Sequence, residues 1–443
     1  MRNIVIKKGH NIKMLGIPPT DIISHSKPES VALTPAKFRG VKPKLLVKEG
    51  DRVKIGDAIF FDKKKPDVKW GSPANGVIKS IQFGNRRTIE KVEITVEGED
   101  SKTFQAFSKN DILTLDREII LNHILDSNLF PIIRQRPFNK TADPTTLPRD
   151  IFVSGYNSAP LSVDLSRVIS NDKETFQRGL TVLSRLTEGS LFLTLGTPIQ
   201  FDDTMVQVIS GPHPAGNVGI QVHHTKSLKP GDIIWSVNAQ HVITLGKLFQ
   251  TGQYDPRILV TVGGSGASNP QLIETTMGAS VKSLVANQSL EKPTRLISGD
   301  VFTGDVVGQN DFLGFYDSTL SIINDQVNRS FLGMLSLGSS DTKYSLTNTF
   351  LSLSRSSFNF TTSQNGEKRA MVPINAWENV LPMDIYPNPL YRAILAQDIE
   401  EMEQLGIWEC DDEDFALCSF ACPSKIDVGQ VIRQGLDLME LEG

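Results

Sequence analysis

Alternating apolar and polar positions predict short strands in the first hundred residues. The run from Val47 to Phe61 contains the pairs Gly50-Asp51 and Gly56-Asp57 between short β-branched and aromatic stretches. Glycine adopts the positive φ of a tight turn, and aspartate can close the turn through its side chain. A similar unit follows at Ser72–Ile81. Short strands, regular turns and no helical period predict a small all-β module over residues 1–100.

The period of the pattern changes after about residue 131. Ile151–Ser154 and Leu191–Leu195 are continuous apolar runs of the length of buried strands. Between them, Lys173–Leu186 has apolar residues at every third or fourth position, which is the spacing of a helix. Strand, helix and strand in this order predict a βαβ unit with parallel strands. We therefore expect a Rossmann-like α/β domain over residues 101–255.

A glycine-rich run at Arg257–Ser268 follows another predicted strand. Its glycines do not complete the G-x-G-x-x-G spacing of a dinucleotide loop, and Asn269-Pro270 interrupts the helix that such a loop needs. Gln271–Val285 predicts instead a second strand, a turn and a short helix. This order resembles the soluble-ligand-binding β-grasp module (SLBB-like), which we place at residues 256–330.

The remaining residues, 331–443, predict a C-terminal helical domain. Leu390–Leu405 carries one apolar stripe, and Gly406 is a suitable stop. The only cysteines of the chain are Cys410, Cys418 and Cys422, and the last two form the Cys-x-x-x-Cys-Pro ending of a ferredoxin motif. A cubane cluster needs four thiolates, and the acidic neighbours of Cys410 disfavour its ionisation. We therefore expect no iron–sulfur cluster in this chain.

Composition and charge narrow the possible functions. An apolar fraction of 39% and a charged fraction of 22% over 443 residues are typical of a folded chain of several domains. A net charge of −4 gives no support to nucleic-acid binding. No stretch approaches 18 apolar residues, and the first residues lack the apolar core of a signal peptide. We expect a cytoplasmic chain that reaches a membrane only through a partner.

The turns of the β module resemble those of biotinyl and lipoyl carrier domains. The connecting stretch Asp62–Trp70 offers lysines but no Met-Lys pair, the usual site of modification in biotinyl carriers. This difference favours a structural barrel-sandwich over a carrier of a modified lysine.

The most specific motif is the loop Gly-Pro-His-Pro-Ala-Gly at residues 211–216. Two prolines stiffen it, and its glycines allow close backbone approach. The loop either faces a ligand or partner through His213, or is a rigid connector that His213 ties down. The candidate contacts for a ligand or a partner are Gly211, Pro212, His213, Pro214 and Gly216. The adjacent His223 and His224 would point to opposite faces of a strand, so we expect no zinc site there.

Taken in order, these motifs resemble the A subunit of the bacterial sodium-translocating NADH:quinone reductase along the whole chain. Two positions depart from the family pattern, namely His241 and the Gln221–His224 stretch. The segments that match the family are the barrel turns, Phe83–Arg87, Arg136–Phe138, Gly211–Gly216, Ile297–Gly299 with Gly304, Arg369–Ile374, Leu381–Ile385 and Cys418–Pro423 with Lys425.

The resemblance implies a six-subunit complex that oxidises NADH, reduces ubiquinone and exports sodium. This chain would be its peripheral subunit on the cytoplasmic face of the bacterial inner membrane, next to the quinone-associated B subunit in the membrane and to the C subunit. Flavins and iron–sulfur centres would belong to partner subunits, while this chain would have no cofactor and no activity alone, and would serve the quinone-reduction end and assembly. The alternative is an Rnf-type or complex-I-like electron-transfer subunit that binds flavin or NADH. Its Rnf-type form would carry ferredoxin-spaced cysteines, which this chain lacks.

Overall fold

A seven-stranded sheet in the order β1-β14-β13-β12-β15-β10-β11 forms the centre of the molecule. The computed structural model describes residues 1–22, 24–290, 293–326, 335 and 337–442. The sheet consists of β1 (Arg2–Val5), β10 (Arg134–Arg136), β11 (Lys140–Thr141), β12 (Asp150–Gly155), β13 (Leu191–Leu195), β14 (Met205–Ser210) and β15 (Ile234–Asn238). The first five strands of the order are parallel, and β10 pairs antiparallel with β15 and β11. Because β1 pairs with β14, the start of the chain belongs to this sheet.

Helices cover both faces of the central sheet. On one face lie α3 (Leu165–Asn171), α4 (Lys173–Ser184) and α6 (Ala239–Thr251), and on the other lies α5 (Val218–Lys226). Successive strand residues point to opposite faces. Phe152 and Ile234 accordingly pack with Val222 of α5, whereas their neighbours Ile151 and Trp235 join the core under α4 and α6. The predicted βαβ unit is confirmed, since β12, α4 and β13 lie where the pattern places them.

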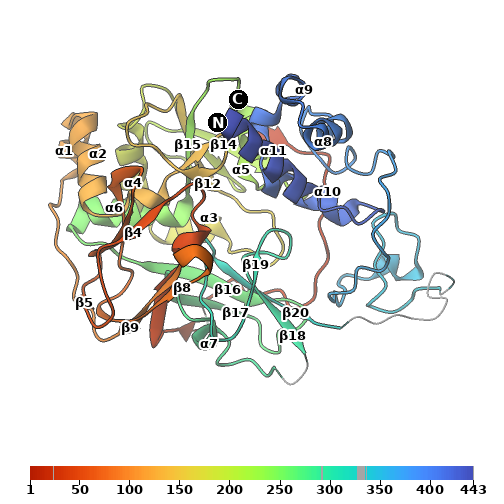
Figure 1. Cartoon of the computed structure of the whole chain (residues 1–443), viewed down its shortest axis with the longest axis horizontal. Coiled ribbons are helices and arrows are strands. Elements are labelled where there is room, and N and C mark those ends of the chain that lie inside the picture. Colours follow the sequence, from red (N-terminus) through yellow and green to blue (C-terminus); the bar gives the residue numbers. More distant parts are fainter. Residues whose placement is uncertain (23, 291–292, 327–334, 336, 443) are drawn as a thin grey trace.

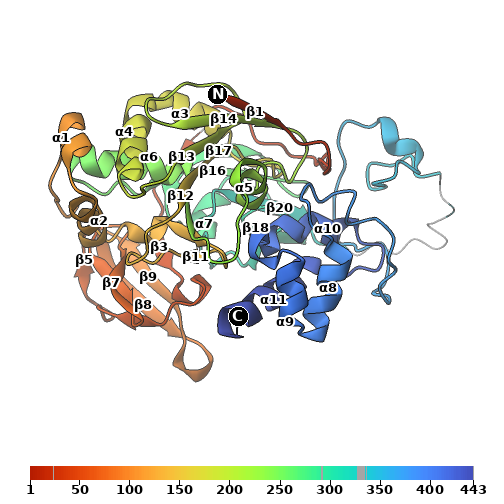
Figure 2. The same cartoon turned by 90° about the horizontal axis from the view of Figure 1, so that it is seen from above.

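The N-terminal module is a barrel-sandwich of two small sheets, shown in orange and red in Figures 1 and 2. Trp70 and Phe60 stack in its core with ring centroids 4.6 Å apart. The helices α1 (Lys109–Thr114) and α2 (Arg117–Asp126) connect it to the central sheet. Its strands are β3 (Ser30–Leu33), β4 (Pro43–Leu45), β5 (Arg52–Val53), β6 (Ala58–Asp62), β7 (Lys65–Gly71), β8 (Gly76–Phe83) and β9 (Ile89–Val96).

The β-grasp module forms a six-stranded sheet in the order β19-β18-β20-β16-β17-β2. Strands β16 and β17 form an antiparallel pair and α7 (Val281–Leu284) follows them, so the two predicted strands and the predicted short helix are confirmed. The short strand β2 of the N-terminal segment completes its edge. The elements are β2 (Ser24–His25), β16 (Arg257–Gly263), β17 (Gln271–Thr276), α7 (Val281–Leu284), β18 (Thr294–Ser298), β19 (Asp305–Val307) and β20 (Thr319–Asn324).

The C-terminal region is helical (blue in Figure 2), and its core also includes Ile4, Ile6, Ile209 and Ile220 of the central domain. Its helices are α8 (Pro387–Ala396), α9 (Ile399–Gln404), α10 (Ala416–Ala421) and α11 (Val428–Glu442). The prediction of one helix over Leu390–Leu405 was wrong. Gln397 adopts a left-handed conformation with φ of 56°, and Asp398 then caps α9 by accepting the N–H of Glu401. The apolar stripe continues across the break, so periodicity alone could not reveal it.

Within the residues that the structure describes, no helix combines the length and the apolar character needed to cross a bilayer. The domain limits at residues 100, 255 and 330 stay predictions.

Candidate functional site

Loops at the carboxyl ends of β12 and β15 enclose a crevice of about 160 Å³. From β12 the chain passes outward to β13 and β14, and then returns to β15 on the other side of β12. The strand order therefore reverses between β12 and β15. In parallel α/β sheets, ligands bind outside the carboxyl ends of the strands at such a reversal. The lining includes Arg134, Arg136, Ser154, Tyr156, Asn157, Ala159, His213, Gly216, Asn217, Ser236, Asn238, His241, Asp300, Tyr316 and Glu413.

The loop at residues 211–216 follows β14 and is fixed by backbone contacts. The carbonyl oxygen of His213 accepts the N–H of His10 at 2.8 Å, and the N–H of His213 donates to Oδ1 of Asn11 at 2.8 Å. Gly216 lies so close to the loop after β12 that a Cβ there would stand 2.2 Å from the backbone nitrogen of Ser158. The loop is therefore held rigidly against two distant segments.

The imidazole of His213 is buried and stacks on Phe302, with ring centroids 4.7 Å apart and nearly parallel planes. The hydroxyl group of Ser158 accepts the N–H of Gly216 at 2.7 Å, which leaves its own hydrogen for Nδ1 of His213 at 3.1 Å. In this arrangement Nε2 carries the ring hydrogen. Nε2 is buried and has no hydrogen-bond partner among the described residues. Burial lowers the pKa of His213 to about 4, so the ring is neutral near pH 7.

His241, at the start of α6, is the second buried histidine of the crevice. Burial and the charge of Arg134 lower its pKa to about 4. The guanidinium of Arg134 lies 4.8 Å from the ring centroid of Tyr316. Arg134 has no ion pair with a carboxylate in the part of the chain that the structure describes. The crevice thus combines two neutral imidazoles with the guanidinium of Arg134, which forms no ion pair with a carboxylate among the described residues.

A buried network of charges closes the crevice on the side of the C-terminal region. Arg136 is only 3% exposed; it forms an ion pair with Asp411 at 3.3 Å, contacts Glu413, and lies 3.6 Å from a carboxyl oxygen of Asp414. Asp411 also pairs with Arg39 and Arg433, each at 3.4 Å. The acidic run of the sequence is therefore a buried junction between the C-terminal region, the barrel and the central sheet.

The carboxyl groups of this junction titrate differently. Burial would raise the pKa of Asp411, but the nearby Arg136 keeps it well below its usual range. Burial and the charge of Asp411 raise the pKa of Asp412 to about 6. Burial also raises the pKa of Asp414, which the charge of Arg136 only partly offsets. Asp411 is therefore the principal charged partner of Arg136, and Asp414 favours its protonated form.

Of the five predicted contact residues, two line the crevice, namely His213 and Gly216. Pro214 is buried, whereas Gly211 and Pro212 are half-buried outside the lining. Sequence reasoning did not find the other side chains that meet His213, chiefly Ser158 and Phe302. The position of Ser158, four residues after a predicted buried strand, was the one available signal.

The expectation that His223 and His224 lie on a strand was wrong, because both lie in α5. Nδ1 of His223 is 2.8 Å from Glu409, and Nε2 of His224 is 2.7 Å from the carbonyl oxygen of Pro382. Both side chains thus fasten α5 to the C-terminal region. The described residues contain no group of three or more His, Cys, Asp or Glu side chains placed to hold a metal ion.

The three thiols lie in the C-terminal core, and none is more than 3% exposed. Burial raises the pKa of Cys410 and of Cys418. Thiolates, not thiols, ligate iron. The environment of these two side chains therefore disfavours their use as cluster ligands.

Comparison with known proteins gives the family. Three family models match successive parts of the chain: the "NqrA N-terminal barrel-sandwich hybrid domain" at residues 4–97, the "NqrA second alpha/beta domain" at 115–254 and the "NQRA C-terminal domain" at 259–308. Among curated proteins, the A subunit of the Na(+)-translocating NADH-quinone reductase from Hahella chejuensis is 37% identical, and the alignment covers 99% of this chain and 100% of that protein. The chain belongs to this A-subunit family.

Other members are similar to the same degree. The A subunits from Pseudomonas aeruginosa and Yersinia pseudotuberculosis are each 38% identical, over 99% of this chain and 100% of theirs. Among solved structures, an NAD+-reducing [NiFe]-hydrogenase in the air-oxidized state aligns with 51% of this chain and 52% of its own, at 14% identity and a TM-score of 0.32. The family expected from the motifs is confirmed by the relatives of full length.

Proposed function

We propose that this chain is the peripheral A subunit of a six-subunit, sodium-translocating NADH:ubiquinone reductase, and that it contributes to the quinone-reduction end and to assembly. The observation that carries the proposal is full-length similarity to proteins named as this subunit. In this role the chain is part of a translocase and has no turnover of its own.

The crevice supports a contact with the quinone ring. A quinone offers two carbonyl oxygens, and Nε2 of His213 is a buried hydrogen-bond donor without a partner among the described residues. Leaving such a donor unsatisfied costs about 1–3 kcal/mol, so the site favours an acceptor. The neutral state of His213 suits a neutral ring, and Arg134 can donate to a second oxygen. The remaining loop residues, Gly211, Pro212, Pro214 and Gly216, hold this donor in place.

In the proposed complex, flavins and iron–sulfur centres belong to partner subunits. The buried thiols of Cys410 and Cys418, with their raised pKa values, support a chain without a cluster of its own. The quinone-associated B subunit in the membrane is the proposed principal neighbour, and the C subunit is a second one. The chain would lie against them on the cytoplasmic face of the inner membrane.

The proposal is tested by reconstitution. Membranes that contain the other subunits but lack the A subunit should regain sodium-stimulated reduction of quinone by NADH when this chain is added. The proposed role would be contradicted if the membranes contain the other subunits but still fail to reduce quinone after this chain is added. An absorption band of flavin or of an iron–sulfur cluster in the purified chain would contradict the cofactor assignment.

The quinone contact is tested separately with the purified chain. Binding of the ubiquinone ring without its tail is followed by tryptophan fluorescence. His213→Phe keeps the aromatic stack but removes the donor, and should weaken binding by up to about tenfold. His123→Phe, which changes a histidine outside the crevice, is the matched control. Equal affinities of the two variants would exclude His213 as the contact.

A further inference from the structure

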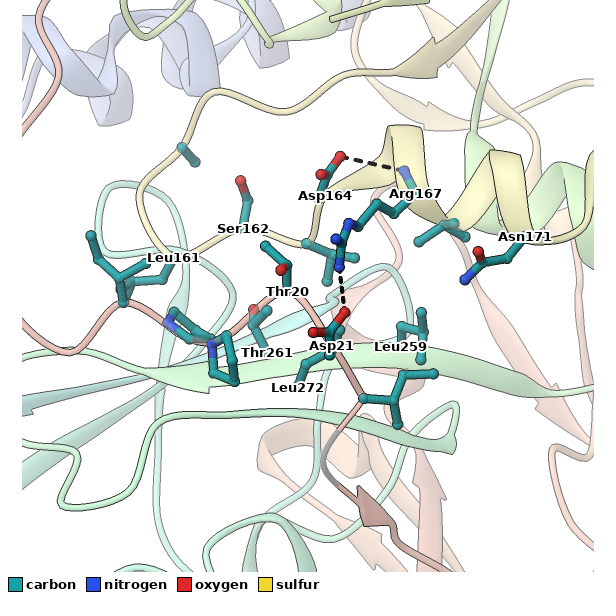
Figure 3. Close-up of a pocket in the computed structure, with 17 residues that line it drawn as sticks. Thr20, Asp21, Leu161, Ser162, Asp164, Arg167, Asn171, Leu259, Thr261 and Leu272 are labelled. Carbon is teal, nitrogen blue, oxygen red and sulfur yellow. Dashed lines mark hydrogen bonds and ion pairs between the residues drawn. The ribbon is translucent and has the colours of Figure 1, made fainter. Parts of the chain in front are cut away.

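The two cavities of the molecule differ in how far their charged groups are satisfied. The larger cavity, of about 670 Å³, lies between the central domain and the β-grasp sheet (Figure 3). Arg167, the cation among its described lining residues, pairs with Asp21 at 2.5 Å, and Asp164 accepts two backbone N–H groups at the start of α3. The crevice of His213 is smaller, but several of its hydrogen-bond donors have no partner among the described residues.

Two buried groups that line the crevice lack a hydrogen-bond partner within the described part of the chain, and both are donors. One is Nε2 of His213 and the other is Nε of Arg136. Each of these residues is only 3% exposed, so water reaches neither donor easily. A buried donor without an acceptor is destabilising. The crevice is therefore complementary to a ligand with acceptor oxygens.

The positive charge of Arg134 is also available to a ligand. Its guanidinium forms no ion pair with a carboxylate among the residues that the structure describes. The two carboxylates of the lining have other partners. Glu413 contacts Arg136, and Asp300 accepts the backbone N–H and the hydroxyl group of Thr303 at 3.1 and 2.7 Å. A negatively charged ligand could therefore pair with Arg134 without displacing an existing ion pair.

Helix α6 begins at the same crevice, since both Asn238 and His241 line it. Oδ1 of Asn238 caps the helix by accepting the N–H of Gln240 at 2.9 Å. The N-terminus of a helix carries a partial positive charge that stabilises anions nearby. This helix terminus, Arg134 and the two buried donors surround a volume of only about 160 Å³. They therefore act on the same few atoms of a ligand.

We infer that the crevice of His213 binds the reduced, negatively charged form of the quinone ring more tightly than the oxidised form. The inference rests on the proposed function for its ligand, and it names the redox state that the site favours. One electron from the redox centres of partner subunits converts the neutral quinone into a semiquinone anion, whose charge lies mainly on the two oxygens. A second electron and two protons from water complete the quinol.

The preference follows from the donors of the crevice. A hydrogen bond to a charged acceptor is about twice as strong as one to a neutral acceptor. The donors and the helix terminus are fixed before the electron arrives, so they stabilise the new charge without rearranging. Arg134 contributes most, because its full charge meets the charge that reduction creates.

The test uses two quinones of nearly equal size that differ in charge. The compound 2-hydroxy-1,4-naphthoquinone is an anion near neutral pH, and its charge is shared among ring oxygens as in a semiquinone. Its methyl ether is neutral. Dissociation constants of both for the purified chain are measured by tryptophan fluorescence. The anion should bind about tenfold more tightly than the ether.

Three variants locate this preference. Arg134→Met removes the charge but keeps a long side chain, and should bring the two affinities within about twofold of each other. Arg295→Met is the matched control, because Arg295 lies on β18 outside the crevice lining and pairs with Asp325. Asn238→Asp keeps the N-cap, since aspartate caps helices as well as asparagine does. It places a negative charge in the crevice, and should weaken binding of the anion about tenfold but leave the ether nearly unchanged.

The outcomes separate this inference from the proposed function. Binding of the ether as tight as that of the anion by the parent chain would overturn the inference and leave the quinone contact intact. A preference that persists in both Arg134→Met and Asn238→Asp would also overturn it, because the anion would then bind elsewhere. Should Arg134→Met fail to fold, the outcome for Asn238→Asp decides. If neither compound binds, the inference and the quinone contact both fail.

Discussion

The crevice of His213 and a pocket of about 670 Å³ between the central domain and the β-grasp sheet share one loop but differ in their ion pairs. Buried and half-buried side chains from distant segments surround the crevice, and the buried charges beside it converge on Arg136. The pocket has mixed polar and apolar walls, and the pair Arg167–Asp21 at its edge has side chains that are 51% and 88% exposed. Buried pairs cannot open without exposing charge to a medium that solvates it poorly, whereas exposed pairs exchange readily with water. The crevice is therefore a fixed site, and the pocket can adjust to a ligand.

The largest expected effect tests this difference directly. Arg136→Ala leaves the buried carboxylate of Asp411 without its principal partner and should lower the free energy of unfolding by about 3–5 kcal/mol. Arg167→Ala removes the exposed pair and should lower it by less than about 1 kcal/mol. Urea unfolding of both variants measures the two values. Similar losses for the two variants would remove the distinction between the cavities.

A second prediction concerns His213, one of the two buried histidines of the crevice. The pKa of His213 is about 4 in the folded chain, against 6.5 as its ordinary value. On acidification, His213 therefore takes up its proton at a higher pH in the unfolded chain than in the folded chain. The stability that the neutral ring contributes is present above about pH 6.5 and is lost as the pH falls toward about 4. The loss reaches about 3 kcal/mol at the lower limit.

Unfolding in urea between about pH 7 and about pH 4.5 checks this prediction. His213→Phe should lose less stability on acidification than the parent does. His25→Phe is the control, because the side chain of His25 is 73% exposed on β2. An unchanged pH dependence in His213→Phe would show that this ring does not carry the effect.

The smallest expected effect concerns backbone approach. Gly216→Val places carbon atoms against the backbone of residues 157 and 158, so it should destabilise the chain by about 1–3 kcal/mol and reduce quinone turnover of the complex. Ser162→Val introduces the same valine side chain beside the open pocket, and should change the free energy of unfolding by no more than about 0.5 kcal/mol. Thermal unfolding together with the reconstituted activity measures both. If Gly216→Val is as mild as Ser162→Val, the crevice is not the rigid member of the pair.

Local pattern was sufficient for several elements of the fold. The prediction of Leu191–Leu195 as a strand agrees with β13 residue for residue, and α4 begins at the predicted Lys173. Leu191–Leu195 is a short continuous apolar run of the length of a buried strand, and α4 has one buried face of helical period, so the sequence alone indicates both elements. The same reasoning failed for α5, where Val218, Ile220 and Val222 alternate as in a strand. Helix α5 is covered on both sides, because Val222 packs on the central sheet and Ile220 packs on the C-terminal core.

The candidate site was predictable in part. The two prolines and two glycines around His213 indicated a stiff loop with close backbone approach, and the structure has both. The partners of His213 could not be predicted, because Ser158 and Phe302 belong to two other segments of the chain. The acidic run at residues 409–414 was apparent as a motif, but its burial depends on Arg136, about 270 residues earlier.

By itself, the sequence determined the local elements, the rigid loop, the shortage of cysteines for a cluster and the family. It did so because propensity, periodicity and motif spacing act over a few residues. Only the tertiary structure decided that β1 joins the central sheet, that Arg136 meets the acidic run, and that two cavities adjoin at Ala159. Those outcomes depend on contacts between distant segments, whose free energies are gained only when all the domains pack together.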